Sequence, residues 1–192
     1  MALTLAGIEQ RFAERGAEQY SGEPVTQLQH ALQTATLAEQ EGADDALVSA
    51  ALLHDLGHLL HDLGDTPSLH GVDDLHQYRA LPFLRGLFPD PVLDAISLHV
   101  DAKRYLCAAR AGYQEQLSLD SQRSLMLQGG VFDPGAAAAF IARPGAAQAL
   151  RLRLWDDLAK DPARATPTLR HFLERAERCV LGPLAGPAGP GP

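Results

Sequence analysis

The chain has 192 residues and a formal net charge of -8 at pH 7, which fits one domain with an acidic exterior rather than a nucleic-acid-binding surface. No stretch approaches the roughly 18 apolar residues of a membrane span, and no basic start precedes an apolar run, so we expect neither membrane insertion nor export. Cys107 and Cys179 lie far apart, outside any CxxC spacing, which favours reduced thiols and a cytoplasmic setting.

Composition and periodicity favour an all-α fold. Hydrophobic residues make up 46% of the chain and aromatic residues 6%, and the abundance of Ala and Leu suits closely packed helices. A first amphipathic helix is predicted at 4–16, followed by a loop at 19–25. The T-x-x-Q pattern at 26–29 is typical of a capping box opening a helix that stops at Gly42. Asp44 is suited to cap a buried helix that Gly57 ends.

The second half of the chain predicts a series of further helices. Residues 60–71 are expected to form a loop; helical character returns near Val72, with Pro82 as a kink or a new start. Asp90 and Pro91 are a suitable N-cap and first residue for the helix at 91–106. Shorter helices fit 119–127, 134–142, 147–160 and 168–180, which gives eight or nine in all. We expect one domain at 1–181 and a disordered Gly/Pro-rich tail at 182–192.

The adjacent pair His54 and Asp55, in the segment LLHDLGHLL, indicates a metal site. An imidazole nitrogen and a carboxylate oxygen can bind one metal ion, and the second carboxylate oxygen can bridge to another. His61, His70 and His171 are interpreted as ordinary core or surface residues. Together with this pair, the candidate metal ligands at helical positions are His30, His54, Asp55, His76, His99 and Asp156. Imidazoles and carboxylates without a thiolate suit iron, manganese or a similar cation better than structural zinc.

The order His, His-Asp, two further histidines and Asp resembles the HD-domain superfamily, in which five or more helices surround a metal core. The resemblance covers nearly the whole chain, and the extra histidines His76 and His99 look like the binuclear branch. Five segments look specifically like the mixed-valent di-iron oxygenases of phosphonate catabolism. These segments are YSGEPVTQLQH at 20–30, LLHDLGH at 52–58, HVDAKRYL at 99–106, QGG at 128–130 and RLWD at 153–156.

The resemblance implies a ligand set and a cofactor. One iron ion would be held by His30, His54 and Asp156, the other by His76 and His99, with Asp55 as the bridge. The pair of irons would be mixed-valent, Fe(II)/Fe(III), with molecular oxygen as the co-substrate. The second iron would have fewer protein ligands and therefore open positions for a substrate.

The resemblance also implies the residues that meet the substrate. His58, Lys103, Ser121, Gln128 and Arg153 match positions near the phosphonate, and Asp55, His58 and Lys103 are the catalytic candidates. Lys103 and Arg104 follow His99 by four and five residues, and cationic donors suit an oxyanion. His58 follows His54 by one helical turn, so it can face the same pocket.

Tyr20 and Glu23 lie in the loop before the first ligand helix. In the related oxygenases the matching Tyr and Glu form a lid: the Tyr occupies the substrate position on iron, and the Glu meets the substrate's ammonium group. A phenol oxygen is a reasonable ligand for a hard metal, and a carboxylate is the natural partner of an ammonium group. The resemblance thus implies 2-amino-1-hydroxyethylphosphonate or an N-methylated analogue as substrate.

The implied reaction is oxidative cleavage of the carbon-phosphorus bond of a 1-hydroxyphosphonate, giving a carboxylate such as glycine and inorganic phosphate. Such an enzyme would act after a hydroxylase in a two-step pathway, with neither nucleic acid nor membrane as a partner. Two alternatives remain open at this point: a metal-dependent phosphohydrolase acting on a nucleotide or another phosphomonoester, and a non-catalytic HD-like binding domain. The sequence does not determine the oligomeric state.

Overall fold

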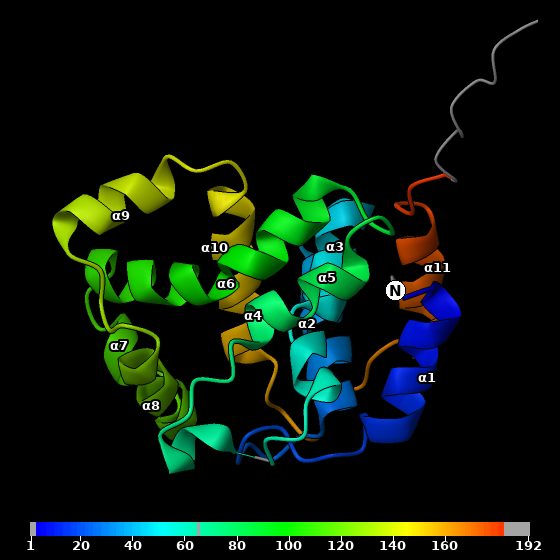
Figure 1. Cartoon of the computed structure of the whole chain (residues 1–192), viewed down its shortest axis with the longest axis horizontal. Helices are drawn as coiled ribbons and strands as arrows, with labels where there is room; N and C mark the ends of the chain where they lie inside the picture. Colours follow the sequence, from blue (N-terminus) through cyan, green and yellow to red (C-terminus); the bar gives the residue numbers. More distant parts are fainter. Residues whose placement is uncertain (1–2, 65, 183–192) are drawn as a thin grey trace, which may run out of the picture.

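The computed structural model describes residues 3–64 and 66–182 and contains eleven α-helices and two short 3-10 helices in those ranges (Figure 1). The predicted all-α class is confirmed, and the tail expected at 182–192 lies, apart from its first residue, outside the described residues. The α-helices are α1 (Leu5–Arg15), α2 (Gln27–Gln40), α3 (Asp45–Leu53), α4 (His76–Arg79), α5 (Leu81–Leu84), α6 (Asp90–Ala109), α7 (Tyr113–Gln116), α8 (Leu119–Leu127), α9 (Pro134–Ile141), α10 (Ala146–Leu158) and α11 (Leu169–Glu177); the 3-10 helices are η1 (Leu56–Leu60) and η2 (Pro67–His70).

The longer helices begin where short polar side chains cap them. Thr26 accepts from the backbone N–H of Gln29 at 3.2 Å, and the Gln29 side chain accepts from the N–H of Thr26 at 2.9 Å, which completes the predicted capping box of α2. Asp44 accepts from the N–H of Leu47 and starts α3, as predicted. These two caps fix the starts of the helices that lead to His30 and His54.

Several boundaries differ from the sequence-based expectations. Helix α3 ends at Leu53, so His54 is its C-cap and Asp55 lies in the turn before η1. Helix α4 begins only at His76, after Leu75 has taken a left-handed φ of 53°. Pro89, rather than Asp90, is the N-cap of α6. Helix boundaries depend on backbone conformation, which side-chain periodicity does not show.

The predicted number of helices covers only the longer ones. Eight α-helices have eight or more residues, whereas α4, α5 and α7 have four residues each. The expectation of eight or nine therefore missed single-turn helices, and η2 lies within the predicted loop at 60–71. Single turns give too short a hydrophobic repeat to be recognised in a sequence.

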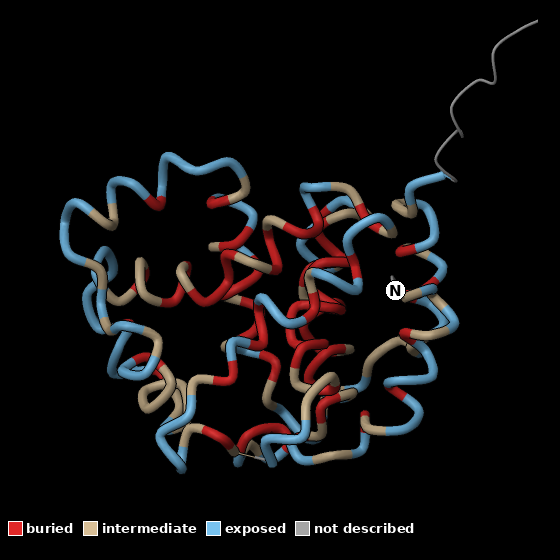
Figure 2. The backbone as a smooth tube through the Cα atoms, in the orientation of Figure 1, coloured by how far each residue is buried: buried red, intermediate tan, exposed pale blue. Residues whose placement is uncertain are grey.

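The core lies where α2, α3, α6, α10 and α11 meet (Figures 1 and 2). Every residue of α3 from Leu47 to Leu53 is buried, which confirms it as a central helix. The α9 segment and the α7–α8 region lie at the periphery, with more exposed residues. In the described part of the chain, no helix has both the length and the apolar character needed to span a membrane.

Gly57 allows the turn after the His54–Asp55 pair to pack against α4. A Cβ atom at Gly57 would lie 2.1 Å from the backbone oxygen of His76 and 2.6 Å from its carbonyl carbon. Such distances are far below van der Waals contact, and both His76 atoms belong to the backbone rather than to a flexible side chain. Gly57 therefore sets how closely the turn carrying Asp55 approaches the helix carrying His76.

The substitution Gly57→Ala should destabilise the fold by about 3 kcal/mol, because the two backbone segments must separate. It should also lower metal retention, since His76 would move away from Asp55. Thermal unfolding followed by circular dichroism, together with metal analysis, measures both effects. Gly7→Ala is the matched control: it lies in α1 and would meet only side-chain atoms at 3.3 Å or more. Equal melting temperatures for Gly57→Ala and the wild type would contradict this interpretation.

Candidate functional site

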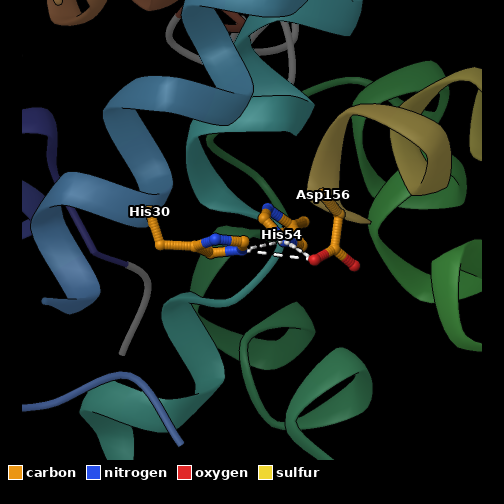
Figure 3. Close-up of side chains that lie close together, drawn as sticks. All are labelled: His30, His54 and Asp156. Carbon is orange, nitrogen blue, oxygen red and sulfur yellow. Dashed lines mark hydrogen bonds and ion pairs between the residues drawn. The ribbon is translucent and has the colours of Figure 1, made fainter. Parts of the chain in front are cut away.

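The first cluster of potential ligands is formed by His30, His54 and Asp156, which come from α2, the end of α3 and α10 (Figure 3). The Nε2 atoms of His30 and His54 are 3.2 Å apart. Asp156 Oδ1 lies 3.4 Å from His30 Nε2 and 4.0 Å from His54 Nε2. All three residues are buried, so helices distant in sequence place three ligand atoms around one point.

The second cluster is formed by Asp55, His76 and His99. His76 begins α4 and His99 lies in the middle of α6, and their Nε2 atoms are 3.1 Å apart. Asp55 Oδ1 lies 3.4 Å from His76 Nε2 and 3.5 Å from His99 Nε2. Pro82 is the second residue of α5, three residues beyond the end of α4, so it leaves His76 in place.

Asp55 faces both clusters with different oxygen atoms. Its Oδ2 lies 3.3 Å from His54 Nε2 and 3.5 Å from His30 Nε2, whereas its Oδ1 points to His76 and His99. Oδ1 is buried without a hydrogen-bond partner. A buried carboxylate oxygen without a hydrogen-bond partner requires a compensating cation. The two oxygens of Asp55 are thus arranged as in a carboxylate that bridges two metal ions.

Hydrogen bonds at the Nδ1 atoms orient all four imidazoles. The Nδ1 of His30 donates to the Ala159 carbonyl at 2.9 Å and that of His76 to Asp74 at 2.8 Å. The corresponding acceptors for His54 and His99 are the carbonyls of Ala51 at 2.9 Å and Ile96 at 2.7 Å. With Nδ1 protonated, each neutral ring presents an Nε2 lone pair to the centre, as metal-binding histidines do.

Two facing lone pairs repel each other unless a cation lies between them, so the donor set fits a pair of metal ions. When no metal ion is bound, a proton on His30 meets the same demand for positive charge. Although burial favours the neutral imidazole, hydrogen bonding to Asp156 and Asp55 raises the pKa of His30 to about 9. Burial also opposes the charge of Asp55, but His54 and His58 outweigh it and hold the pKa of that carboxyl well below its ordinary value.

Arg153 fixes Asp156 from the side opposite the histidines. Its Nη1 donates to Asp156 Oδ2 at 2.7 Å, and its Nη2 pairs with Asp157. Oδ1 of Asp156 therefore stays directed towards His30 and His54. Arg153 also lines the adjoining cavity, as the sequence analysis expected, but its main contacts are with these carboxylates.

A cavity of about 50 Å³ adjoins the second cluster. Lys103 reaches it from α6, one turn beyond His99, and donates to Ser124 Oγ at 2.8 Å. Burial, with a smaller effect of the Arg153 charge, lowers the pKa of Lys103 to about 7. Of the residues predicted to meet a substrate, those that line this cavity are Tyr20, His58, Lys103, Ser121, Gln128 and Arg153.

His58 stacks on His76 with ring centroids 4.2 Å apart, and its Nε2 lies 3.8 Å from Asp55 Oδ1. Its Nδ1 is held by Asp74 Oδ2 at 2.7 Å. Asp74 also accepts from His76 and lies 3.3 Å from His61 Nε2. Asp74 was not among the residues predicted from the sequence, and the spacing D-x-H that ends at His76 is the signal that would have indicated it.

Tyr20 covers the centre from the loop between α1 and α2. Its ring stacks on His30 with centroids 3.8 Å apart and planes at 11°, and it stands edge-on to His58. Burial, reinforced by the negative charges of Asp55 and Asp156, raises the pKa of its hydroxyl well above the ordinary value. The positive φ values of Ser21 (34°) and Gly22 (75°) turn the chain back after Tyr20.

Two of the predicted substrate contacts lie elsewhere. Arg104 does not line the cavity: it donates to the carbonyls of Gly130 at 2.8 Å and Gly129 at 3.1 Å, because the helical rotation after Lys103 directs it away from the cavity. Glu23 does not line the cavity either; its Oε1 pairs with Lys160 Nζ at 2.9 Å. Arg104 thus holds the turn after α8, and Glu23 has a cationic partner within the chain.

Comparison with known proteins places this arrangement in a family. The HD domain matches residues 28–127. The chain belongs to the HD-domain family. That range contains the two histidine pairs and Asp55, whereas Asp156 lies beyond it.

The chain is also similar to curated proteins over most of its length. It is 39% identical to the [1-hydroxy-2-(trimethylamino)ethyl]phosphonate dioxygenase (glycine-betaine-forming) of Leisingera caerulea, over 88% of this chain and 86% of the relative. It is 40% identical to the hydroxymethylphosphonate dioxygenase of Gimesia maris, over 85% of this chain and 82% of the relative. An uncharacterized protein of Acanthamoeba polyphaga mimivirus is 31% identical over 88% and 77% of the two chains. The expected resemblance to HD-domain phosphonate oxygenases is confirmed.

The substitution Asp55→Ala should remove both metal ions from this HD-domain protein, because one side chain serves both clusters and the Nε2 atoms would then face each other without a carboxylate. Metal analysis after gel filtration measures the content per chain. Asp62→Ala is the matched control, since the Asp62 side chain is fully exposed and lies 3.7 Å from Arg15 Nη1, away from both clusters. Two retained metal ions in Asp55→Ala would contradict the bridging geometry.

Lys103 predicts a pH dependence of anion binding. Because its pKa is about 7, it is cationic below that pH and neutral above it; a phosphonate should therefore bind more weakly as the pH rises. Lys103→Arg keeps its charge throughout, so the ratio of KM values, wild type to variant, should grow by about tenfold between pH 7 and pH 8.5. Ionisation of the substrate cancels in this ratio. A ratio that does not change with pH would contradict the assignment.

Proposed function

We propose that the protein cleaves the carbon-phosphorus bond of a 1-hydroxyphosphonate with molecular oxygen, giving a carboxylate and inorganic phosphate. The observation that carries the proposal is Asp55, whose two oxygens face two separate imidazole pairs next to a cavity containing a buried lysine. The names of the two dioxygenase relatives support oxidation rather than hydrolysis.

The metal ions in this proposal are two irons in the Fe(II)/Fe(III) state. His30, His54 and Asp156 would hold one, His76 and His99 the other, and Asp55 both. Imidazole and carboxylate ligands without thiolate suit iron in either oxidation state. When bound, the iron pair supplies the activation of oxygen and an anchor for the substrate's hydroxyl and phosphonate oxygens.

The protein's own side chains would orient the phosphonate. Lys103 supplies a charge-assisted hydrogen bond to one oxygen, and Ser121 supplies a hydroxyl donor from α8. The Oε1 atom of Gln128 is buried without a partner, so it can accept a hydrogen bond from the substrate's hydroxyl group. These three groups line the same cavity as the second cluster, which has fewer protein ligands than the first.

His58 and Tyr20 would complete the site around the substrate. Asp74 holds the Nδ1 of His58, which leaves Nε2 to accept or donate a proton at the substrate. Tyr20 covers His30 and limits the entry of water, which favours oxidation at the hydroxyl-bearing carbon over side reactions. Tyr20 must move when a substrate enters, because a cavity of about 50 Å³ holds only a few water-sized groups.

The proposed reaction balances without an external reductant. The hydroxyl-bearing carbon loses its C–H and C–P bonds and becomes the carboxylate carbon, while the phosphorus gains an oxygen and leaves as phosphate. Both oxygen atoms of O2 are accounted for in these two products. The hydroxyl group must already be present on the substrate, so a hydroxylation of the parent phosphonate has to precede this step.

Iron-loaded protein should consume oxygen and release phosphate in equal amounts from a 1-hydroxyphosphonate, and removal of oxygen should abolish both signals. The panel would contain hydroxymethylphosphonate, 2-amino-1-hydroxyethylphosphonate and its trimethylammonium analogue, with the parent phosphonates that lack the hydroxyl group as controls. An oxygen electrode and a colorimetric phosphate assay are sufficient.

The same experiment tests the phosphohydrolase alternative. A phosphohydrolase would release phosphate from a nucleoside monophosphate without oxygen, whereas the proposed enzyme would leave that compound intact. Phosphate release from a hydroxyphosphonate that persists under anaerobic conditions would overturn the oxygenase proposal. The filled ligand positions speak against the non-catalytic alternative, because a binding domain has no need for a complete binuclear ligand set.

A further inference from the structure

The Glu23–Lys160 ion pair connects three segments around the cavity. Lys160 Nζ lies 2.9 Å from Glu23 Oε1 and 3.2 Å from Ser118 Oγ. Glu23 belongs to the loop whose Tyr20 and Ser21 line the cavity, and Ser118 caps α8, whose Ser121 also lines it. The side chains of Glu23 and Lys160 are only 14% and 15% exposed. The pair therefore lies outside the cavity lining and connects the loop of Tyr20 with the start of α8, two segments that contribute to that lining.

The backbone holds Lys160 at this position. The preceding carbonyl, that of Ala159, accepts the hydrogen bond from His30 Nδ1, so this part of the chain is tied to the first cluster. Gln33, one turn along α2, bonds to both the carbonyl and the N–H of Asp161 on the other side. The lysine backbone is thus fixed on both sides, and its ammonium group is directed to Glu23.

This pairing changes the charge that a substrate meets. Glu23 lies on the same loop as Tyr20, which must move when a substrate enters, and an ammonium group next to the hydroxyl-bearing carbon would be attracted to the Glu23 carboxylate. In the structure the Lys160 ammonium group already forms an ion pair with that carboxylate. A cationic substrate must therefore displace Lys160 or bind without its carboxylate partner, and an uncharged one need do neither.

We infer that Lys160 is a specificity-determining residue, which selects against hydroxyphosphonates that carry an ammonium group. This inference rests on the proposed function and names the substrates that the same site prefers: 1-hydroxyphosphonates with a small uncharged substituent. The small cavity of about 50 Å³ favours the same class. The positive charges of Lys103 and Lys160 then have different roles: Lys103 attracts the phosphonate, and Lys160 repels an ammonium group.

The substitution Lys160→Met leaves Glu23 without its partner and should raise the preference for cationic substrates. We expect kcat/KM for 2-amino-1-hydroxyethylphosphonate, relative to hydroxymethylphosphonate, to increase by about tenfold over the wild type, mainly through KM. Lys160→Arg keeps the charge and should retain the wild-type ratio. The double variant Glu23→Gln/Lys160→Met should lose the gain, because it has no carboxylate for the ammonium group.

Ser118→Ala is the matched control, since it removes the second contact of Lys160 and leaves the ion pair intact; the ratio should stay at the wild-type value. Equal losses of activity on both substrates in Lys160→Met would show that the lysine only holds the loop, and an unchanged ratio would likewise overturn the inference. Anaerobic calorimetry gives the ratio of Kd values for the same two compounds without turnover. The Kd ratio tests Lys160 even if no hydroxyphosphonate is cleaved, whereas the absence of oxygen-dependent cleavage for every compound would overturn only the proposed function.

Discussion

The central interaction of this fold is the sharing of one carboxylate by two imidazole pairs. Oδ2 of Asp55 faces His30 and His54, and Oδ1 faces His76 and His99. Histidines from four separate helices must converge within 3.5 Å of a single carboxylate for this to occur. The cost of burying the carboxylate is large unless positive charge is nearby, so the metal ions that compensate it would also hold α2, α3, α4 and α6 together.

The fold fixes the imidazoles before any ion binds. His54 and His99 each donate Nδ1 to the carbonyl three residues earlier, so the helix that carries the ligand also orients it. His30 depends instead on the Ala159 carbonyl beyond α10, and His76 on Asp74. Two ligands are therefore set locally and two by tertiary contacts. Rigid ligands need little reorganisation when a metal ion binds. The anchored Nδ1 atoms therefore define the coordination geometry more closely than helix packing alone would.

The sequence was sufficient to predict the all-α class, the cap of α2, the HD-domain family and the residues that converge on Asp55. Periodicity and capping are local properties, and the order of the histidines and aspartates is specific enough to identify the family. Local patterns could not predict where the side chains of Arg104 and Glu23 point. Arg104 differs from Lys103 by one helical step, and Glu23 is paired with a lysine 137 positions away. Both depend on tertiary contacts that leave no local pattern, as do Asp74 and the single-turn helices.

The distribution of charge explains how an acidic protein can bind an anionic substrate. The net charge of -8 lies on the chain as a whole, but the carboxylates nearest the centre are occupied by specific partners: Asp156 by Arg153, Asp74 by histidines, and Glu23 by Lys160. Lys103, in contrast, donates to the hydroxyl group of Ser124 and forms no ion pair with a carboxylate of the described residues, and burial lowers its pKa. A dianionic phosphonate would supply that missing charge. Lys103 would then become fully protonated as the substrate binds, so that the site gains its positive charge at the moment when an anion is present to compensate it.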